Sequence, residues 1–236
     1  EPEGVHLGRL LKAMGAEITG EGTEQITVYG RRGKRLLSGC RYRVPGDRIA
    51  AGTYLLMGAA TRGHLTLSGA PLDEMGAVLS LYQKIGGQYT RKSGTLVADS
   101  KNVQHAVPYV ETEEYPGFPT DLQSQLLATL CVARGRSVIR ECIFEERFRI
   151  APWLNRMGAD VTTDGREAVI EGKAHLSGQM VKAQELRGGA ALVIAALMAQ
   201  GITRVYGSAF IERGYEDLAG DLRKLGAVIS KKKAER

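Results

Sequence analysis

A repeat with a period of about 70 residues is the feature that most restricts the fold of this 236-residue chain. Four tripeptides consist of an apolar residue, glycine and a small residue, each after a helical pattern: 14–16, 85–87, 157–159 and 225–227. A second anchor, at Gly63, Gly135 and Gly201, lies upstream of three of them and recurs with nearly the same step. Because both sets of glycines recur at nearly the same spacing, they indicate three full copies of one unit.

Each full unit predicts the order strand, helix, strand, helix, strand, strand. The first helix of a unit is apolar on every face, as in 189–199 and most of 125–133, which predicts full burial. The second helix alternates charged and apolar faces and should lie nearer the surface. A period of this length is too long for a common solenoid, so we expect one domain at 44–236 with three buried helices among sheets and outer helices.

Residues 1–43 match only the second half of a unit, with a helix through 7–15 and strands near 16–19 and 24–30. The first half of that unit is missing. We therefore expect 1–43 to be the C-terminal remnant of a preceding domain, and the chain to be the C-terminal part of a longer protein.

Composition narrows the classes of protein to consider. No apolar run approaches the roughly 20 residues that cross a bilayer, the start Glu1-Pro2-Glu3 is unlike a signal peptide, and three cysteines without a CxxC pair favour a reducing compartment. We thus expect a cytoplasmic protein without a membrane partner. Four scattered histidines predict no metal or other cofactor.

The formal net charge is +6, with basic runs at 31–35 and 231–236. A net positive charge of this kind favours partners that carry phosphate groups. No helix-turn-helix signature or zinc-finger spacing accompanies it, so nucleic acid is not an expected partner.

The stretch YPGFPTDLQSQ at 115–125 places a carboxylate at the start of a buried helix. Pro116 and Pro119 restrict the incoming chain, and Thr120 with Gln123 fits a capping box, so Asp121 is predicted in the first turn. There its charge faces the positive end of the helix dipole. An acidic residue in a first turn can serve stability alone, so both interpretations stay open at this point.

Carboxylates and arginines recur at the other predicted helix starts, among them Asp47, Arg48, Glu185, Arg187, Glu145, Glu146, Arg147, Glu212 and Arg213. Because arginine at a helix N-terminus opposes the dipole, its repetition suggests a bound anion, with Arg147 and Arg213 the best cases. The alternative for each is an ion pair with the adjacent Glu146 or Glu212.

Several long motifs resemble the C-terminal portion of the bacterial UDP-N-acetylglucosamine enolpyruvyl transferases (1-carboxyvinyltransferases), in the same order and spacing along the whole chain. They are GDRIAAGT at 46–53, PGFPTDLQ at 116–123, FEERF at 144–148, ELRGGAALVIAAL at 185–197 and ERGYEDL at 212–218. The resemblance implies an inside-out α/β barrel with three repeated units. It also implies transfer of the enolpyruvyl group of phosphoenolpyruvate to the 3′-hydroxyl of UDP-N-acetylglucosamine, with release of phosphate, as the first committed step of peptidoglycan synthesis.

The resemblance further implies roles for individual residues. Asp121 matches the carboxylate that contacts the 3′-hydroxyl, a candidate general base, and Ile143 matches a position lining the uridine nucleotide site. Arg147 and Arg213 match arginines that hold phosphoenolpyruvate, and Arg213 is a second catalytic candidate. Glu185 and Arg187 match the polar start of the third buried helix.

The reactive cysteine loop and the N-terminal lysine of the family have no counterpart in this sequence. We therefore expect catalysis to require the missing N-terminal half as a partner. Two alternatives remain: a shikimate-phosphate enolpyruvyl transferase, against which PGFPTDLQ argues, and a truncated, non-catalytic module that binds a UDP-sugar or a partner protein.

Overall fold

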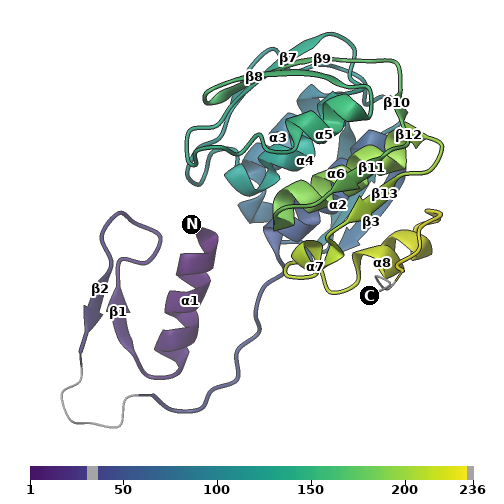
Figure 1. Ribbon diagram of the computed structural model, residues 1–236. Coiled ribbons are helices and arrows are strands. Elements are labelled where there is room, and N and C mark those ends of the chain that lie inside the picture. Colours follow the sequence, from purple (N-terminus) through teal and green to yellow (C-terminus); the bar gives the residue numbers. More distant parts are fainter. Residues whose placement is uncertain (31–36, 233–236) are drawn as a thin grey trace.

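The computed structural model describes residues 1–30 and 37–232, in which a small N-terminal lobe lies beside a larger α/β body (Figure 1). The lobe contains α1 (Pro2–Ala13) and the hairpin of β1 (Glu17–Thr19) and β2 (Thr27–Tyr29), which confirms the elements predicted there. The basic run at 31–35 and the end of the run at 231–236 lie outside the described residues.

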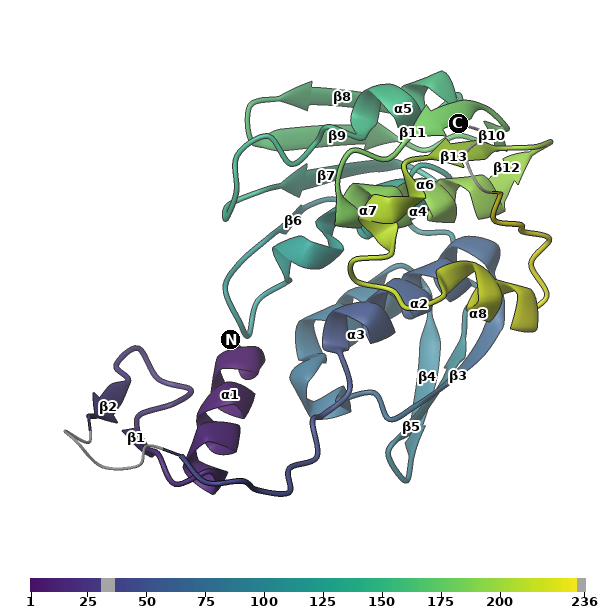
Figure 2. The same cartoon turned by 60° about the horizontal axis from the view of Figure 1, so that its bottom comes forward.

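Three helices form the centre of the larger body: α2 (Arg48–Thr61), α4 (Gln123–Leu130) and α6 (Leu186–Met198). Each of the three contacts both of the others (Figure 2). Most of their side chains are buried. The prediction of one buried helix in each unit is confirmed. None of the helices described here has the length and apolar character needed to span a membrane.

Sheets in the first two units have the same internal order. In the first, β3 (His64–Ser68), β5 (Thr95–Asp99) and β4 (Gln88–Lys92) are ordered β3-β5-β4. In the second, β6 (Val110–Glu111), β7 (Arg136–Arg140), β9 (Glu167–Glu171) and β8 (Asp160–Asp164) are ordered β6-β7-β9-β8. The outer helices of these units are α3 (Gly76–Lys84), after the 3₁₀ turn η1 (Leu72–Glu74), and α5 (Ala151–Arg156). In each unit the last strand lies between the first strand of the hairpin and the strand that precedes the outer helix.

The prediction of a strand before α2 in the first unit is wrong, because residues 37–47 contain none, and the third unit departs further from the predicted order. It contains β10 (Leu176–Ser177) parallel to β12 (Ala199–Gln200), β11 (Met180–Lys182) parallel to β13 (Arg204–Tyr206), α7 (Ser208–Ile211) and α8 (Leu218–Lys224). The prediction of further strands after α8 is wrong for the described residues 227–232. The segment there corresponds to β4 and β8, which pair only with a central strand, β5 or β9. The described part of the third unit contains no such central strand, and residues 227–232 pair with none of the described strands.

The predicted inside-out α/β barrel is wrong for the described residues. The described strands form five separate sheets and do not close into a barrel. What the structure shows is a mixed α/β fold in which sheets and outer helices surround three central helices.

Contacts at the start of α2 join the lobe to the body. The Arg48 guanidinium donates to Glu3 Oε1 at 2.8 Å and also pairs with Glu1, whose other oxygen accepts from the Tyr115 backbone N–H at 2.8 Å. His6 Nε2 lies 2.6 Å from Glu74 Oε1. Arg48 is therefore engaged in structural ion pairs, and Asp47 caps α2 by accepting from the backbone N–H of Ile49 at 2.7 Å.

Gly52 allows the close approach of α2 to the turn before α4, because a Cβ atom there would lie 2.4 Å from a Leu122 methyl group. We expect Gly52→Ala to lower the free energy of unfolding by about 2 kcal/mol, since overpacking displaces the buried Leu122. Gly58→Ala on the same helix is the control: its Cβ would meet Leu65 at 3.6 Å, and the change should be neutral or favourable. Equal urea midpoints for the two variants would contradict this account.

Candidate functional site

Asp121 lies in a cluster with two arginines at the N-terminal ends of the central helices. It occupies the 3₁₀ turn η2 (Thr120–Leu122) that leads into α4. Arg147 Nη2 donates to Asp121 Oδ1 at 2.9 Å, and Arg187 Nη2 donates to Asp121 Oδ2 at 2.8 Å. Arg187 comes from α6 of the third unit, so two repeats contribute to one cluster.

Opposing effects set the charge of this cluster. Burial favours the neutral form of Asp121, but Arg187 and then Arg147 outweigh it and hold the pKa of Asp121 below its ordinary value. Burial likewise disfavours the charged form of Arg187, and Asp121 outweighs it, so the pKa of Arg187 is raised. The cluster therefore holds one carboxylate and two guanidiniums, a net positive charge that suits an anionic ligand.

Arg147 is held by partners on two sides and lies in a turn. Its guanidinium stacks over the Phe144 ring, 4.8 Å from the ring centroid, as well as pairing with Asp121. Because α5 begins only at Ala151, the prediction that Arg147 lies at a helix N-terminus is wrong. Its alternative partner, Glu146, pairs with Arg149 instead.

Glu185 and Arg213 differ in their relation to the cluster. Glu185 is the N-cap of α6, where its carboxylate accepts from the backbone N–H groups of Arg187, at 2.7 Å, and Gly188. Arg213 is exposed in the turn between α7 and α8 and forms no ion pair with any residue in 1–30 or 37–232; its predicted place at a helix N-terminus is wrong. The adjacent Glu212 pairs with Lys231 at 2.5 Å. The structure thus joins Asp121, Arg147 and Arg187 directly and places Glu185 at the cap of the helix that carries Arg187, whereas Arg213 forms no ion pair with Asp121.

Glu141 is a buried residue of this region that sequence reasoning missed. Its Oε2 accepts from the Thr120 hydroxyl at 2.9 Å, so the predicted capping box between Thr120 and Gln123 is wrong. Its Oε1 accepts from the backbone N–H groups of Ile143 at 2.9 Å and Phe144 at 3.0 Å. The available signal was only a charged residue directly after a strand that itself begins and ends with arginine, and this signal is a weak one.

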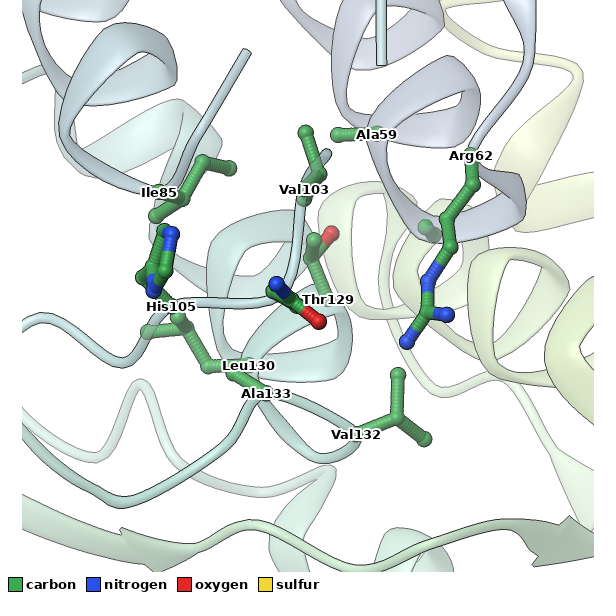
Figure 3. Close-up of a pocket in the computed structure, with 11 residues that line it drawn as sticks. Ala59, Arg62, Ile85, Val103, His105, Thr129, Leu130, Val132 and Ala133 are labelled. Carbon is green, nitrogen blue, oxygen red and sulfur yellow. The ribbon is translucent and has the colours of Figure 1, made fainter. Parts of the chain in front are cut away.

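An open hollow of about 690 Å³ lies where Ile143 meets the segment before Asp121. Its lining residues are Glu111, Thr112, Glu113, Glu114, Pro116, Gly117, Cys142 and Ile143. This volume is within the range of small-molecule sites. A cavity of only about 10 Å³ lies near the C-terminal ends of α2 and α4, among Ala59, Thr129 and His105 (Figure 3), with room for no more than one water molecule.

The lowered pKa of Asp121 predicts a specific effect of acid on stability. The carboxylate stabilises the fold fully above the ordinary aspartate pKa of 3.8, and this contribution is lost as the pH falls through the lowered value in the folded state. We expect Asp121→Asn to unfold with a shallower loss of stability between about pH 5 and pH 2. Urea unfolding at several pH values measures this slope. An unchanged slope would show that the pairs with Arg147 and Arg187 do not stabilise the carboxylate.

Comparisons with known proteins place the chain among the carboxyvinyltransferases. A family model described as EPSP synthase (3-phosphoshikimate 1-carboxyvinyltransferase) matches residues 1–222. A UDP-N-acetylglucosamine 1-carboxyvinyltransferase from Legionella pneumophila is 43% identical over 229 residues, which are 97% of this chain and 45% of that protein. One from Novosphingobium aromaticivorans is 44% identical over 232 residues, 98% of this chain and 53% of that protein. The chain thus spans about half the length of the curated relatives it matches.

Solved structures agree with this placement. The enolpyruvyl transferase NikO from Streptomyces tendae matches with a TM-score of 0.84 and 26% identity over 96% of this chain and 53% of its own. EPSP synthase from Acinetobacter baumannii, at 19% identity, shares the fold with a TM-score of 0.74 over 96% of this chain and 55% of its own. With its repeated α/β units and the match over residues 1–222, the chain belongs to the EPSP synthase family of carboxyvinyltransferases.

Proposed function

We propose that this chain forms the C-terminal half of an enzyme that transfers the enolpyruvyl group of phosphoenolpyruvate to the 3′-hydroxyl of UDP-N-acetylglucosamine, releasing phosphate. The observation that carries the proposal is the carboxylate of Asp121 between Arg147 and Arg187. An open hollow is lined by Ile143 and by the segment that precedes Asp121 in the sequence. Relatives that are 43% and 44% identical to this chain bear the name of this activity. The expected role in peptidoglycan synthesis and the cytoplasmic location would follow from it.

The transfer sets chemical requirements that this cluster can meet. A bond forms between the 3′-oxygen and C2 of the enolpyruvyl group, the bond from C2 to the phosphate oxygen breaks, and the hydroxyl proton must leave. Asp121 would accept that proton, and Arg147 and Arg187 would neutralise the negative charge of phosphoenolpyruvate. If the guanidiniums turn toward this substrate, the pKa of Asp121 rises and the carboxylate becomes a stronger base.

The remaining site residues stay predictions within this proposal. Ile143, which lines the hollow, would contact the uridine nucleotide, and Glu185 would fix the first turn of α6 that carries Arg187. Arg213 would join phosphoenolpyruvate only if the substrate or the partner half draws its turn inward. Residues 1–43 would complete the first domain, and 44–236 would be the second.

A chimeric enzyme tests the proposal. In it, this chain replaces the matching part of the Legionella pneumophila relative, and that intact relative serves as the positive control. Phosphate release from phosphoenolpyruvate is measured with UDP-N-acetylglucosamine and, separately, with shikimate 3-phosphate. We expect release with the UDP-sugar, and no release from this chain without the N-terminal half.

Each other outcome favours a different reading. Release with shikimate 3-phosphate alone would support the other transferase of this fold. Binding of UDP-N-acetylglucosamine by a folded chimera that releases no phosphate would support a non-catalytic module. A folded chimera that neither binds nor turns over the UDP-sugar would contradict the proposal.

A further inference from the structure

Glu141, directly after β7, is a buried carboxylate whose partners are neutral donors. Its residue is 1% exposed, and no lysine, arginine or histidine in the described ranges forms an ion pair with it. Four donors instead converge on its two oxygens: the hydroxyls of Thr112 at 2.8 Å and Thr120 at 2.9 Å, and the backbone N–H groups of Ile143 and Phe144. A carboxylate buried in this way persists only because its hydrogen bonds replace those to water.

The four donors belong to three segments that are separate in the sequence. Thr112 follows β6, Thr120 immediately precedes Asp121, and Ile143 and Phe144 begin the loop that carries Arg147. Thr112 Oγ1 also accepts from the Cys142 backbone N–H at 2.9 Å, so its own hydrogen is directed to Glu141. One side chain therefore fixes the turn of Asp121 relative to the loop of Ile143 and Arg147.

We propose that Glu141 is a positioning residue for the site, which holds Asp121 and Ile143 in register without touching substrate. The proposal deepens the proposed function and rests on it for its link to the UDP-sugar. The stacking of Arg147 over Phe144 extends the same connection to one of the guanidiniums. A displacement of about 1 Å in such a register is enough to change a rate by about a hundredfold.

The chemistry of the four contacts separates conservative from disruptive variants. In Glu141→Gln, the amide oxygen can replace Oε1, and the amide nitrogen can donate to the Thr120 hydroxyl, which is able to accept. Glu141→Ala leaves the backbone N–H groups of Ile143 and Phe144 and two hydroxyls without this acceptor. Thr120→Val keeps the shape of the threonine and removes only the contact to Oε2.

The first arm of the experiment needs no ligand and uses the chain itself. Amide hydrogen exchange is compared for the parent chain, Glu141→Ala and Glu141→Gln, with Glu171→Gln, at the opposite end of the same sheet, as the control. We expect the amides of Ile143 and Phe144 to exchange at least about tenfold faster in Glu141→Ala and near the parent rate in Glu141→Gln. Unchanged exchange in Glu141→Ala, or equal acceleration in both variants, would overturn the proposal.

The second arm measures UDP-N-acetylglucosamine affinity in the active chimera. Glu141→Ala and Thr120→Val should each bind about tenfold or more weakly, with recovery in Glu141→Gln. If Glu141→Ala does not fold, Glu141→Gln and Thr120→Val decide: parent affinity in Thr120→Val would overturn the link to Asp121. If the parent chimera binds no UDP-sugar, the proposed function fails, whereas the exchange comparison still decides whether Glu141 holds the loop.

Discussion

Replacing Asp121 with alanine is expected to lower the turnover number of the active chimera at least about a hundredfold, because no other carboxylate pairs with both arginines in the described structure. Asp121→Asn should lose a similar factor, since an amide cannot accept the hydroxyl proton. The steady-state rate of phosphate release gives both values.

Asp121→Ala should, in contrast, strengthen the binding of an anion. In the absence of Asp121, Arg147 and Arg187 lose the carboxylate that neutralises them, so the chain should bind phosphoenolpyruvate more tightly in a calorimetric titration. Asp164→Ala, an exposed residue at the end of β8, is the control for both measurements. A turnover number in Asp121→Asn close to that of the parent would mean that Asp121 does not take up the proton.

The largest expected loss of stability follows from Gly172→Ala. Gly172 comes just after β9, and a Cβ atom there would lie 1.5 Å from the backbone oxygen of Ala133. A backbone oxygen cannot move aside as a side chain can, so the contact between β9 and the end of α4 must open. We expect the free energy of unfolding to fall by about 3 kcal/mol or more, measured by urea denaturation.

Gly76→Ala is the matched control for Gly172→Ala. Gly76 is the first residue of α3, and a Cβ atom there would meet no atom within 4 Å. Alanine should leave stability unchanged or raise it by up to about 1 kcal/mol. A similar loss in both variants would show that the collision with Ala133 is not the cause of the loss.

The sequence was sufficient to predict the parts of the fold that repetition and periodicity determine. Three nearly equal steps predicted three units, and apolar character on every face predicted that α2, α4 and α6 would be central. Two prolines and a capping box at Thr120 predicted Asp121 in the first turn of a buried helix. The structure places it in the 3₁₀ turn that leads into that helix, without the capping box.

Long-range partners account for the parts that could not be predicted. Thr120 has a local pattern for capping, yet a carboxylate 21 residues away binds its hydroxyl. Arg147 needs no helix terminus because Asp121 and Phe144 hold it from other segments. The strands expected after α8 are absent from residues 227–232, where none of the described strands lies between this segment and β13, and a local pattern does not show whether a long-range partner is present.

Mutual packing of α2, α4 and α6 also limits how this architecture can evolve. A solenoid lengthens by stacking another copy on a free end, because each of its repeats contacts only its neighbours. Here every central helix already contacts the other two, so a duplicated unit would find no vacant side of the core. Gene duplication could therefore multiply whole domains but not units within one, and new specificities would arise in the loops at the helix starts, where Asp121 and Arg187 lie.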